Sequence, residues 1–298
     1  MKRLFIIFMI MCFIPAFAFA DVVDDGLPSD TPAKVKESAR QVISLGVESQ
    51  GVIRMTRTML ENKYTEKQML SAHEVLMKAQ RQNLDTAPIM NKFHESVANK
   101  EKASSSIKAM ETVRSRYETA SGLAGNMIQD KVQAKAMTQE MAECMDAGIK
   151  NKDMEQIAEM LQDRTKTMNA EDAQAFNKGA LGTVKQMAKA GADSGSVTKV
   201  VKNAFEKGYT VRDMEKLGNA FTEQVKNASS ATALANSFAN AVKDGAKADD
   251  VGNYVQRGSG SGSGQEGADS GFGSGGFGSG SGGSGGSGMG GSGGRGRR

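Results

Sequence analysis

Apolar residues recur at intervals of three and four along nearly the whole chain from Ala33 onward. This spacing places them on one face of an α-helix, and no stretch alternates with period two long enough to indicate a strand. The pattern therefore predicts an all-α protein of about eleven or twelve helices. The clearest stripes are Val197, Val200, Val201, Ala204 and Phe205; Met214, Leu217, Phe221 and Val225; Ile107, Met110, Val113 and Tyr117; and Ala173, Phe176, Leu181, Val184 and Met187.

The turn between Lys207 and Met214 predicts where one helix ends and the next begins. Gly208 suits the left-handed residue that ends a helix, and Thr210 with Asp213 has the spacing of a capping box. Tyr209 and Met214 are five residues apart, which is the spacing of a hydrophobic staple. The two helices are therefore expected to be joined by a very short turn.

The same turn recurs along the chain. When the sequence is aligned with itself at an offset of 145 residues, identical residues coincide at several positions. An offset of 37 residues aligns Gly208 with Gly245 and Gly46 with Asn83. Asn, like Gly, tolerates the left-handed conformation. The pairs related by 145 residues are Gly46 and Gly191, Ser49 and Ser194, Val52 and Val197, Glu61 and Glu206, Tyr64 and Tyr209, Thr65 and Thr210, and Met69 and Met214.

A period of about 37 residues predicts stacked antiparallel helical hairpins, as in an α-solenoid. A compact bundle is the alternative, because the segment from Gly122 to Gln129 interrupts the period. The repeat length resembles that of tetratricopeptide and HEAT-type repeats. The tetratricopeptide pattern of Trp, Leu-Gly, Tyr and a closing Pro is missing, so the resemblance assigns no ligand-binding residue.

Residues 1–20 have the pattern of a secretory signal peptide. Lys2 and Arg3 precede an apolar run, and Ala18 and Ala20 occupy the small-residue positions of a cleavage site. We therefore expect an exported protein, periplasmic or secreted, whose mature chain begins at Asp21. The apolar run is short for a membrane anchor, and the mature sequence has no other candidate for a spanning helix.

Three segments follow the leader. Residues 21–33 are acidic and contain Pro28 and Pro32, which predicts a flexible lead-in, and residues 34–257 form the helical-repeat domain. Residues 258–298 consist mainly of Gly and Ser, which predicts a disordered tail. Its isolated Phe272 and Phe277 and its basic tip, Arg295 to Arg298, are compatible with weak contact to acidic envelope surfaces. A tail that only keeps the protein soluble is the alternative.

Composition narrows the classes of partner and of chemistry. Loss of Lys2 and Arg3 with the leader lowers the formal net charge by two from +4. The positive charge that remains is too small to indicate a nucleic-acid-binding surface. Cys144 would be the only cysteine of the mature chain, so no internal disulfide is expected. The 19 Met residues and the absence of Trp indicate a core of flexible side chains.

No group of residues has the spacing of a catalytic, cofactor-binding or metal site. His73 and His94 lie on different predicted helices, and we expect His73, at the edge of an apolar stripe, to be a packed or half-exposed histidine rather than a ligand. A sulfur-rich stripe on one helix face has the chemistry of a Cu(I) site but also the spacing of an ordinary core; it consists of Met137, Met141, Cys144 and Met145. We interpret the acidic pairs Glu140 with Glu143 and Asp249 with Asp250 as solvated faces and caps, and Gly179 and Gly182 as places where helices approach closely.

These patterns favour an exported, non-catalytic binding or scaffolding module for a protein or peptide partner, because helical arrays expose long surfaces. One alternative is a surface protein tethered through its Gly/Ser tail. Another is soft-metal binding, which would need the sulfurs of Met137, Met141 and Cys144 to face solvent or a cavity. An enzyme with a site assembled from scattered residues would instead show polar groups converging in a closed pocket.

Overall fold

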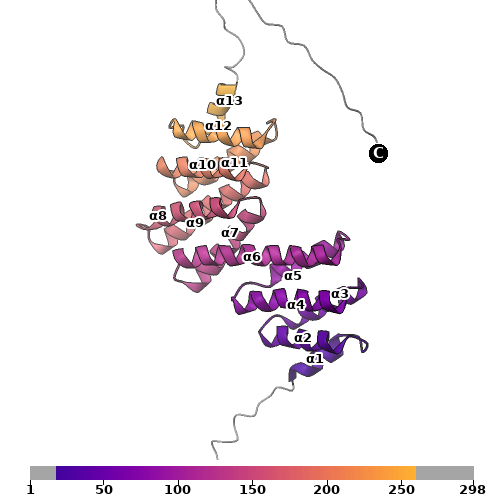
Figure 1. Cartoon of the computed structure of the whole chain (residues 1–298). Helices are drawn as coiled ribbons and strands as arrows, with labels where there is room; N and C mark the ends of the chain where they lie inside the picture. Colours follow the sequence, from indigo (N-terminus) through magenta and orange to yellow (C-terminus); the bar gives the residue numbers. More distant parts are fainter. Residues whose placement is uncertain (1–17, 260–298) are drawn as a thin grey trace, which may run out of the picture. The chain divides into compact units, whose positions relative to one another are not determined.

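The structure is a computed structural model that describes residues 18–259, in which helices joined by turns are the regular elements (Figure 1). The predicted leader up to Phe17 and the predicted tail from residue 260 onward lie outside the described residues. The helices of residues 18–259 are α1 (Ala18–Gly26), α2 (Ala33–Ser44), α3 (Ser49–Glu61), α4 (Glu66–Arg81), α5 (Ala87–Ala98), α6 (Ala103–Met127), α7 (Lys131–Asp146), α8 (Asn151–Thr165), α9 (Ala170–Lys189), α10 (Ser194–Glu206), α11 (Val211–Val225), α12 (Ala231–Lys243) and α13 (Val251–Ser259).

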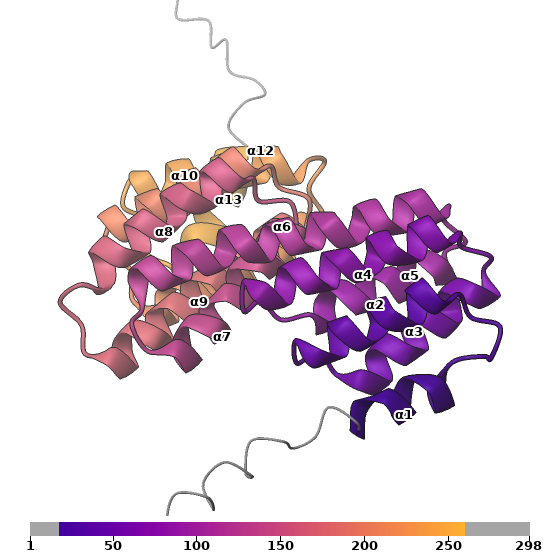
Figure 2. The same cartoon turned by 60° about the horizontal axis from the view of Figure 1, so that its bottom comes forward.

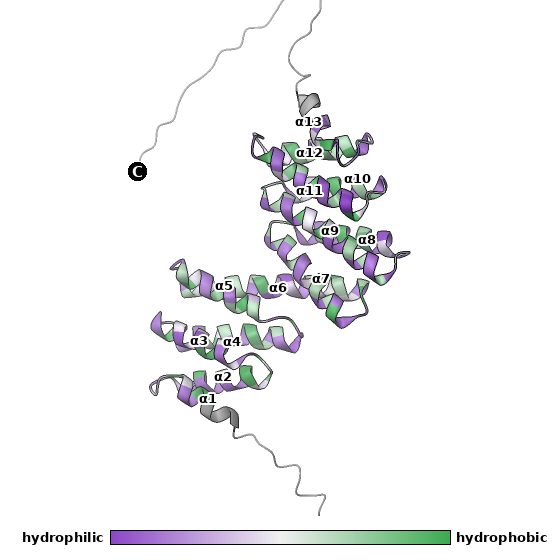
Figure 3. Ribbon diagram, turned by 180° about the vertical axis from the view of Figure 1, so that it is seen from behind, coloured by the Kyte–Doolittle hydropathy of each residue, from purple (hydrophilic) through white to green (hydrophobic). Residues whose placement is uncertain are grey.

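Most helices pack against a sequence neighbour and also against the helix two places further along the chain. Helix α2 lies against α4 and α4 against α6, while α7, α9 and α11 pack in succession and so do α8, α10 and α12 (Figure 1). Each helix carries both apolar and polar residues (Figure 3). An amphipathic helix buries its apolar stripe against such neighbours, so the observed packing explains the three-and-four spacing of the sequence.

Buried apolar side chains form two clusters, and α6 belongs to both. The N-terminal core contains buried residues from Val23 to Val113, and the C-terminal core contains those from Ala120 to Val255. Helix α6 runs alongside helices of both regions (Figure 2). The side chain of Tyr117, near its middle, packs against both cores. The two cores therefore meet at α6.

The turn after α10 has the predicted geometry. Gly208 is left-handed with φ +74°, its N–H donates to the carbonyl of Phe205, and the N–H of Tyr209 donates to the carbonyl of Ala204, both at 3.0 Å. These two bonds form a Schellman motif. The Thr210 side chain then accepts from the backbone of Asp213, whose carboxylate accepts from Thr210, so the capping box is present. The helix stop and the helix start are both confirmed.

The related turn after α3 uses a residue that the sequence did not single out. Lys63 stands at the position of Gly208 and is left-handed with φ +58°, and Tyr64 donates its N–H to the carbonyl of Met59. Asn83 is also left-handed, as predicted, and so is Lys100. Lysine has no preference for this conformation, so these positions are set by the two helix-ending bonds and by burial of the next apolar residue.

Thr210→Ala should lower the free energy of unfolding by about 1 kcal/mol, because it removes the N-cap of α11. Gly208→Val should cost more, because a β-branched side chain resists the left-handed conformation. Urea denaturation measures both changes, and Thr210→Ser, which keeps the hydroxyl, is the control. If Gly208→Val unfolded like the parent, the helix-stop geometry would be contradicted.

The predicted flexible lead-in differs from the structure. Helix α1 covers residues 18–26, and the side chains of Val23 and Leu27, one helical turn apart, are buried in the N-terminal core. Asp24 is paired with Arg40 of α2 at 2.6 Å. Pro28 and Pro32 lie in the connection to α2 rather than in a free segment. Acidic composition suggested flexibility, but ion pairing and two buried apolar residues attach this segment to the fold.

Candidate functional site

Helix α7 lies between α6 and α9 in the middle of the described chain. It packs extensively against α6 and α9, whereas α5 and α7 do not pack extensively on one another within residues 18–259. Cavities therefore lie on both sides of α7. Gln139, exposed on α7, lines cavities on both sides. We call α7 together with the cavities on its two sides the α7 surface.

The side of α7 that faces α5 forms the junction cleft. It consists of two adjoining cavities of about 420 and 320 Å³ that share Tyr117 and Gln139. Asp85, from the turn before α5, and Lys135 of α7 line the larger cavity and pair at 3.8 Å. Arg116 of α6, in the smaller cavity, pairs with Asp146 of α7. Ion pairs thus connect α7 to the turn before α5 and to α6.

Tyr117 gives the junction cleft an aromatic floor with a polar end. Burial, reinforced by the negative charges of Asp85, Glu143 and Asp146, raises the pKa of Tyr117 to about 12. The phenol therefore stays protonated at neutral pH and keeps a donor hydrogen. An aromatic ring with a polar tip is a common anchor in protein interfaces.

Lys185 of α9 connects α7 to the C-terminal core. Its Nζ lies 3.0 Å from Glu140 and 2.8 Å from Glu143. Burial opposes the charge of Lys185, but the hydrogen bonds to these carboxylates outweigh burial and raise the lysine pKa. The hydrogen bond from Lys185 likewise lowers the pKa of Glu143. The acidic pair that the sequence suggested as a solvated face is therefore held in a three-residue ion pair.

The side of α7 that faces α9 forms the second cleft, which we call the amide cleft. It consists of cavities of about 220 and 650 Å³ that share Ile128, Gln133, Gln174 and Asn177. Asn177 of α9 is only 5% exposed, yet its Oδ1 is buried without a hydrogen-bond partner in the described part of the chain. Buried amide oxygens normally accept a hydrogen bond. The Asn177 Oδ1 is therefore an unpaired acceptor on a residue that lines a cavity.

Asn177→Leu should raise the free energy of unfolding by about 1 kcal/mol, because burying an unpaired amide is costly and leucine has a similar volume. Chemical denaturation measures the change. Asn203→Leu is the matched control and should be destabilising, because Asn203 donates to the carbonyl of Ala239 at 2.8 Å. A clear loss of stability in Asn177→Leu would show that the Asn177 amide is satisfied in the folded protein.

His73 lies in the N-terminal core, as its stripe predicted, and lines none of the clefts described above. It is fully buried, with Nε2 at 2.9 Å from the Thr56 hydroxyl and Nδ1 at 3.2 Å from the Ser38 hydroxyl. Burial lowers the pKa of His73 to about 4. The imidazole is therefore neutral at physiological pH and bridges three helices through two hydroxyl groups.

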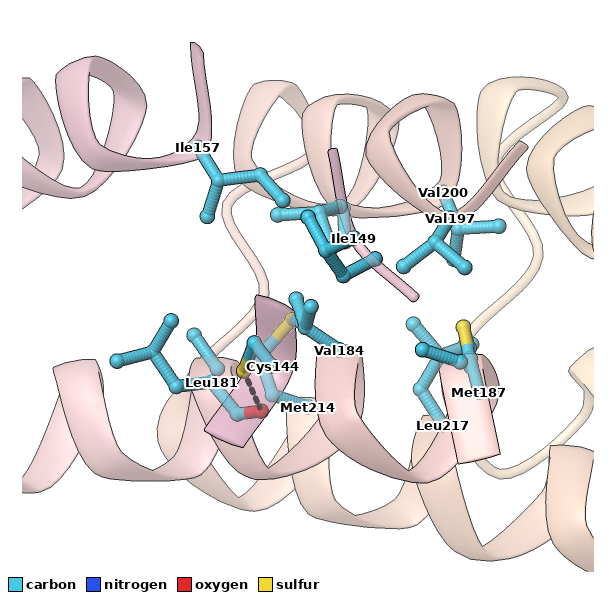
Figure 4. Packing of buried hydrophobic residues seen from close by; sticks show 14 of the residues in the cluster. Cys144, Ile149, Ile157, Leu181, Val184, Met187, Val197, Val200, Met214 and Leu217 are labelled. Carbon is cyan, nitrogen blue, oxygen red and sulfur yellow. Dashed lines mark hydrogen bonds between the residues drawn. The ribbon is translucent and has the colours of Figure 1, made fainter. Parts of the chain in front are cut away.

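The sulfur-rich stripe of α7 packs into the C-terminal core. Met141 and Cys144 have no exposed surface, and Met137 and Met145 are nearly buried. The Cys144 thiol donates to the carbonyl of Leu181 at 3.4 Å, among Val184 and Met214 (Figure 4). Burial raises the pKa of the Cys144 thiol to about 12, which disfavours the thiolate that a soft metal binds. Of the four residues of this stripe, Met137 alone lines the junction cleft or the amide cleft, where it borders the smaller cavity of the amide cleft.

The remaining sequence candidates lie apart from the clefts. Asp249 pairs with Lys216 at 2.7 Å. Gly179 lies where α9 approaches α11, because a Cβ there would be 3.0 Å from Val211, whereas Gly182 faces open space. His94 lies on α5, and burial followed by the charge of Arg54 lowers its pKa. Within residues 18–259, no three His, Cys, Asp or Glu side chains are grouped to hold a metal ion.

Sequence reasoning did not identify Asn177 or Gln139 as site residues. The interruption of the period at residues 122–129 was one available signal, since Gly125 of this segment lines the junction cleft and Ile128 and Gln129 line the amide cleft. Comparisons with models of protein families, with characterised proteins and with solved structures gave no match. Across residues 18–259, no helix combines the length and apolarity needed to cross a membrane.

Proposed function

We propose that the protein is an exported, non-catalytic binding module that engages a protein or peptide partner at the α7 surface. The observation that carries this proposal is the interruption of helix packing between α5 and α7. The interruption leaves a cleft lined by Tyr117, Gln139 and paired charges where an apolar contact would otherwise lie. A mixed polar and aromatic recess of this kind suits recognition of another chain.

We further propose that the helices form a solenoid-like array with a period of about 37 residues. Three contacts between successive helical layers support this proposal. The Tyr209 hydroxyl donates to the carbonyl of Ala246 and Cys144 to that of Leu181, each 37 residues away, and Asn203 donates to that of Ala239, 36 residues away. A repeated contact at a fixed separation is expected when equivalent helices stack.

A non-catalytic role is favoured by the location of the titratable groups. The most strongly perturbed histidine is His73, which lies in the N-terminal core and not at the α7 surface. Several charged groups of the junction cleft are paired with each other, as in Asp85 with Lys135 and Arg116 with Asp146. An acid–base site would require a titratable group free to exchange a proton with a substrate.

Quantitative capture from an envelope extract tests the proposed function. Gln139→Trp places a large ring on the exposed face shared by the cavities of the α7 surface, and it should reduce capture of the major partner at least tenfold. Gln156→Trp, at an exposed position of α8 outside the clefts, is the matched control and should capture normally. Equal capture by both variants, at unchanged melting temperatures, would contradict binding at the α7 surface.

A further inference from the structure

The amide cleft is lined by a buried side-chain amide and by a backbone N–H that has no partner among the described residues. Gln133 of α7 and Asn177 and Gln174 of α9 line it, and none of their side chains forms a hydrogen bond within residues 18–259. Ile128, which follows α6 and also lines the cleft, has extended backbone geometry, with φ −131° and ψ 121°. Its N–H donates to Ala124, whereas no described group bonds the N–H of Gln129. Side-chain and backbone amide groups therefore both line the cleft.

This arrangement has the bonding pattern of a peptide backbone. A side-chain amide carries one acceptor and two donors, so it can pair with both the C=O and the N–H of a peptide unit. The floor of the cleft adds apolar contacts from the buried residues Met137 and Leu181. The charged residues of the lining include both signs, so the lining does not select a strongly charged ligand; they are Asp130, Glu140, Asp163, Lys166 and Lys178. Neutral amides above an apolar floor match an extended peptide better than an anion or a cation.

We propose that the amide cleft binds an extended peptide segment, with Asn177 pairing to its backbone and the Ile128–Gln129 connection lying along its other edge. This inference rests on the proposed function and names its ligand class. The Asn177 Oδ1, buried without a partner, would gain one when the side chain turns toward the entering peptide. Main-chain bonding would supply affinity, and the apolar floor would select the side chain that points inward.

The test uses the mature full-length protein and a random linear dodecapeptide library displayed on phage. A selected peptide is then synthesised with a fluorophore and measured by fluorescence polarisation. We expect Asn177→Leu to weaken its binding about tenfold or more. Asn219→Leu, an exposed amide on α11 outside the cleft, should leave binding unchanged.

Methylation of single backbone nitrogens in the peptide distinguishes backbone pairing from side-chain recognition. At least one N-methyl peptide should lose tenfold in affinity for the parent protein and little for Asn177→Leu. The proposal is overturned if no library peptide binds, or if neither Asn177→Leu nor N-methylation weakens binding. Partner capture that depends on Gln139 but not on Asn177 would overturn this ligand assignment while leaving the proposed function intact.

Discussion

Acidification from pH 7 to 4.5 is expected to lower the free energy of unfolding by about 2 kcal/mol through His73 alone. The folded protein keeps this imidazole neutral down to pH about 4, while the unfolded chain takes up a proton below its ordinary pKa of 6.5. The unfolded state therefore binds more protons between these values. Stability is present above pH 6.5 and is lost as the pH falls toward 4.

The hydrogen bonds of His73 explain why the neutral form suits this site. The Thr56 hydroxyl donates to the carbonyl of Val52 at 2.8 Å, so it can only accept from the imidazole, which places the proton on Nε2. Nδ1 is then an acceptor for the Ser38 hydroxyl. A second proton, on Nδ1, would introduce a buried charge with no carboxylate bonded to the ring.

Urea denaturation at several pH values measures this effect. His73→Gln should be less stable than the parent at pH 7 but should show a flatter dependence on pH between 6.5 and 4.5. His94→Gln is the control and should keep most of the slope, because the His94 side chain is only partly buried. The carboxylates with lowered pKa values titrate below the pH range of this test; they are Asp24, Glu143, Asp193 and Asp213. An unchanged slope in His73→Gln would contradict the buried neutral imidazole.

Phe221→Ala should lower the free energy of unfolding by about 3–5 kcal/mol, because it removes a fully buried ring from the C-terminal core. The ring of Phe221 packs edge-on against Phe238 with centroids 5.4 Å apart. Phe93→Ala is the matching change in the N-terminal core, where Phe93 packs against Tyr64 at 5.8 Å. Chemical denaturation measures both losses.

Hydrogen exchange locates the damage from each substitution. Because the two cores are separate clusters joined at α6, Phe221→Ala should accelerate exchange in α10–α12 more than in α2–α4. Phe93→Ala should show the opposite distribution. Equal acceleration throughout residues 18–259 in both variants would mean that the described part of the chain unfolds as one cooperative core.

The sequence predicted features that depend on local chemistry. Gly208, Thr210 and Asp213 form the predicted helix stop and capping box because each bond joins residues three to five positions apart. Lys63 and Lys100 also adopt the left-handed conformation, but lysine does not signal it. A lysine at a helix end becomes left-handed only because the bonds around it require that geometry.

The candidate site depends on contacts between distant segments. That α5 and α7 fail to stack cannot be inferred from either helix alone, since both carry ordinary amphipathic patterns. Asn177 did offer a signal, because it stands on the apolar face of α9, four residues before Leu181. A polar residue on an apolar stripe indicates either a satisfied core group or a binding group, and only the neighbouring structure distinguishes the two.

Site-specific photo-crosslinking tests the central claim, that a partner occupies the α7 surface. A photoreactive phenylalanine derivative replaces Gln139 in one protein and Gln156 in another, and both are irradiated in the native envelope. Gln139 lines the clefts, whereas Gln156 lies on the exposed face of α8. The account predicts a discrete adduct from position 139 and none from position 156. An adduct of equal yield from both positions, or from 156 alone, would contradict binding at the α7 surface.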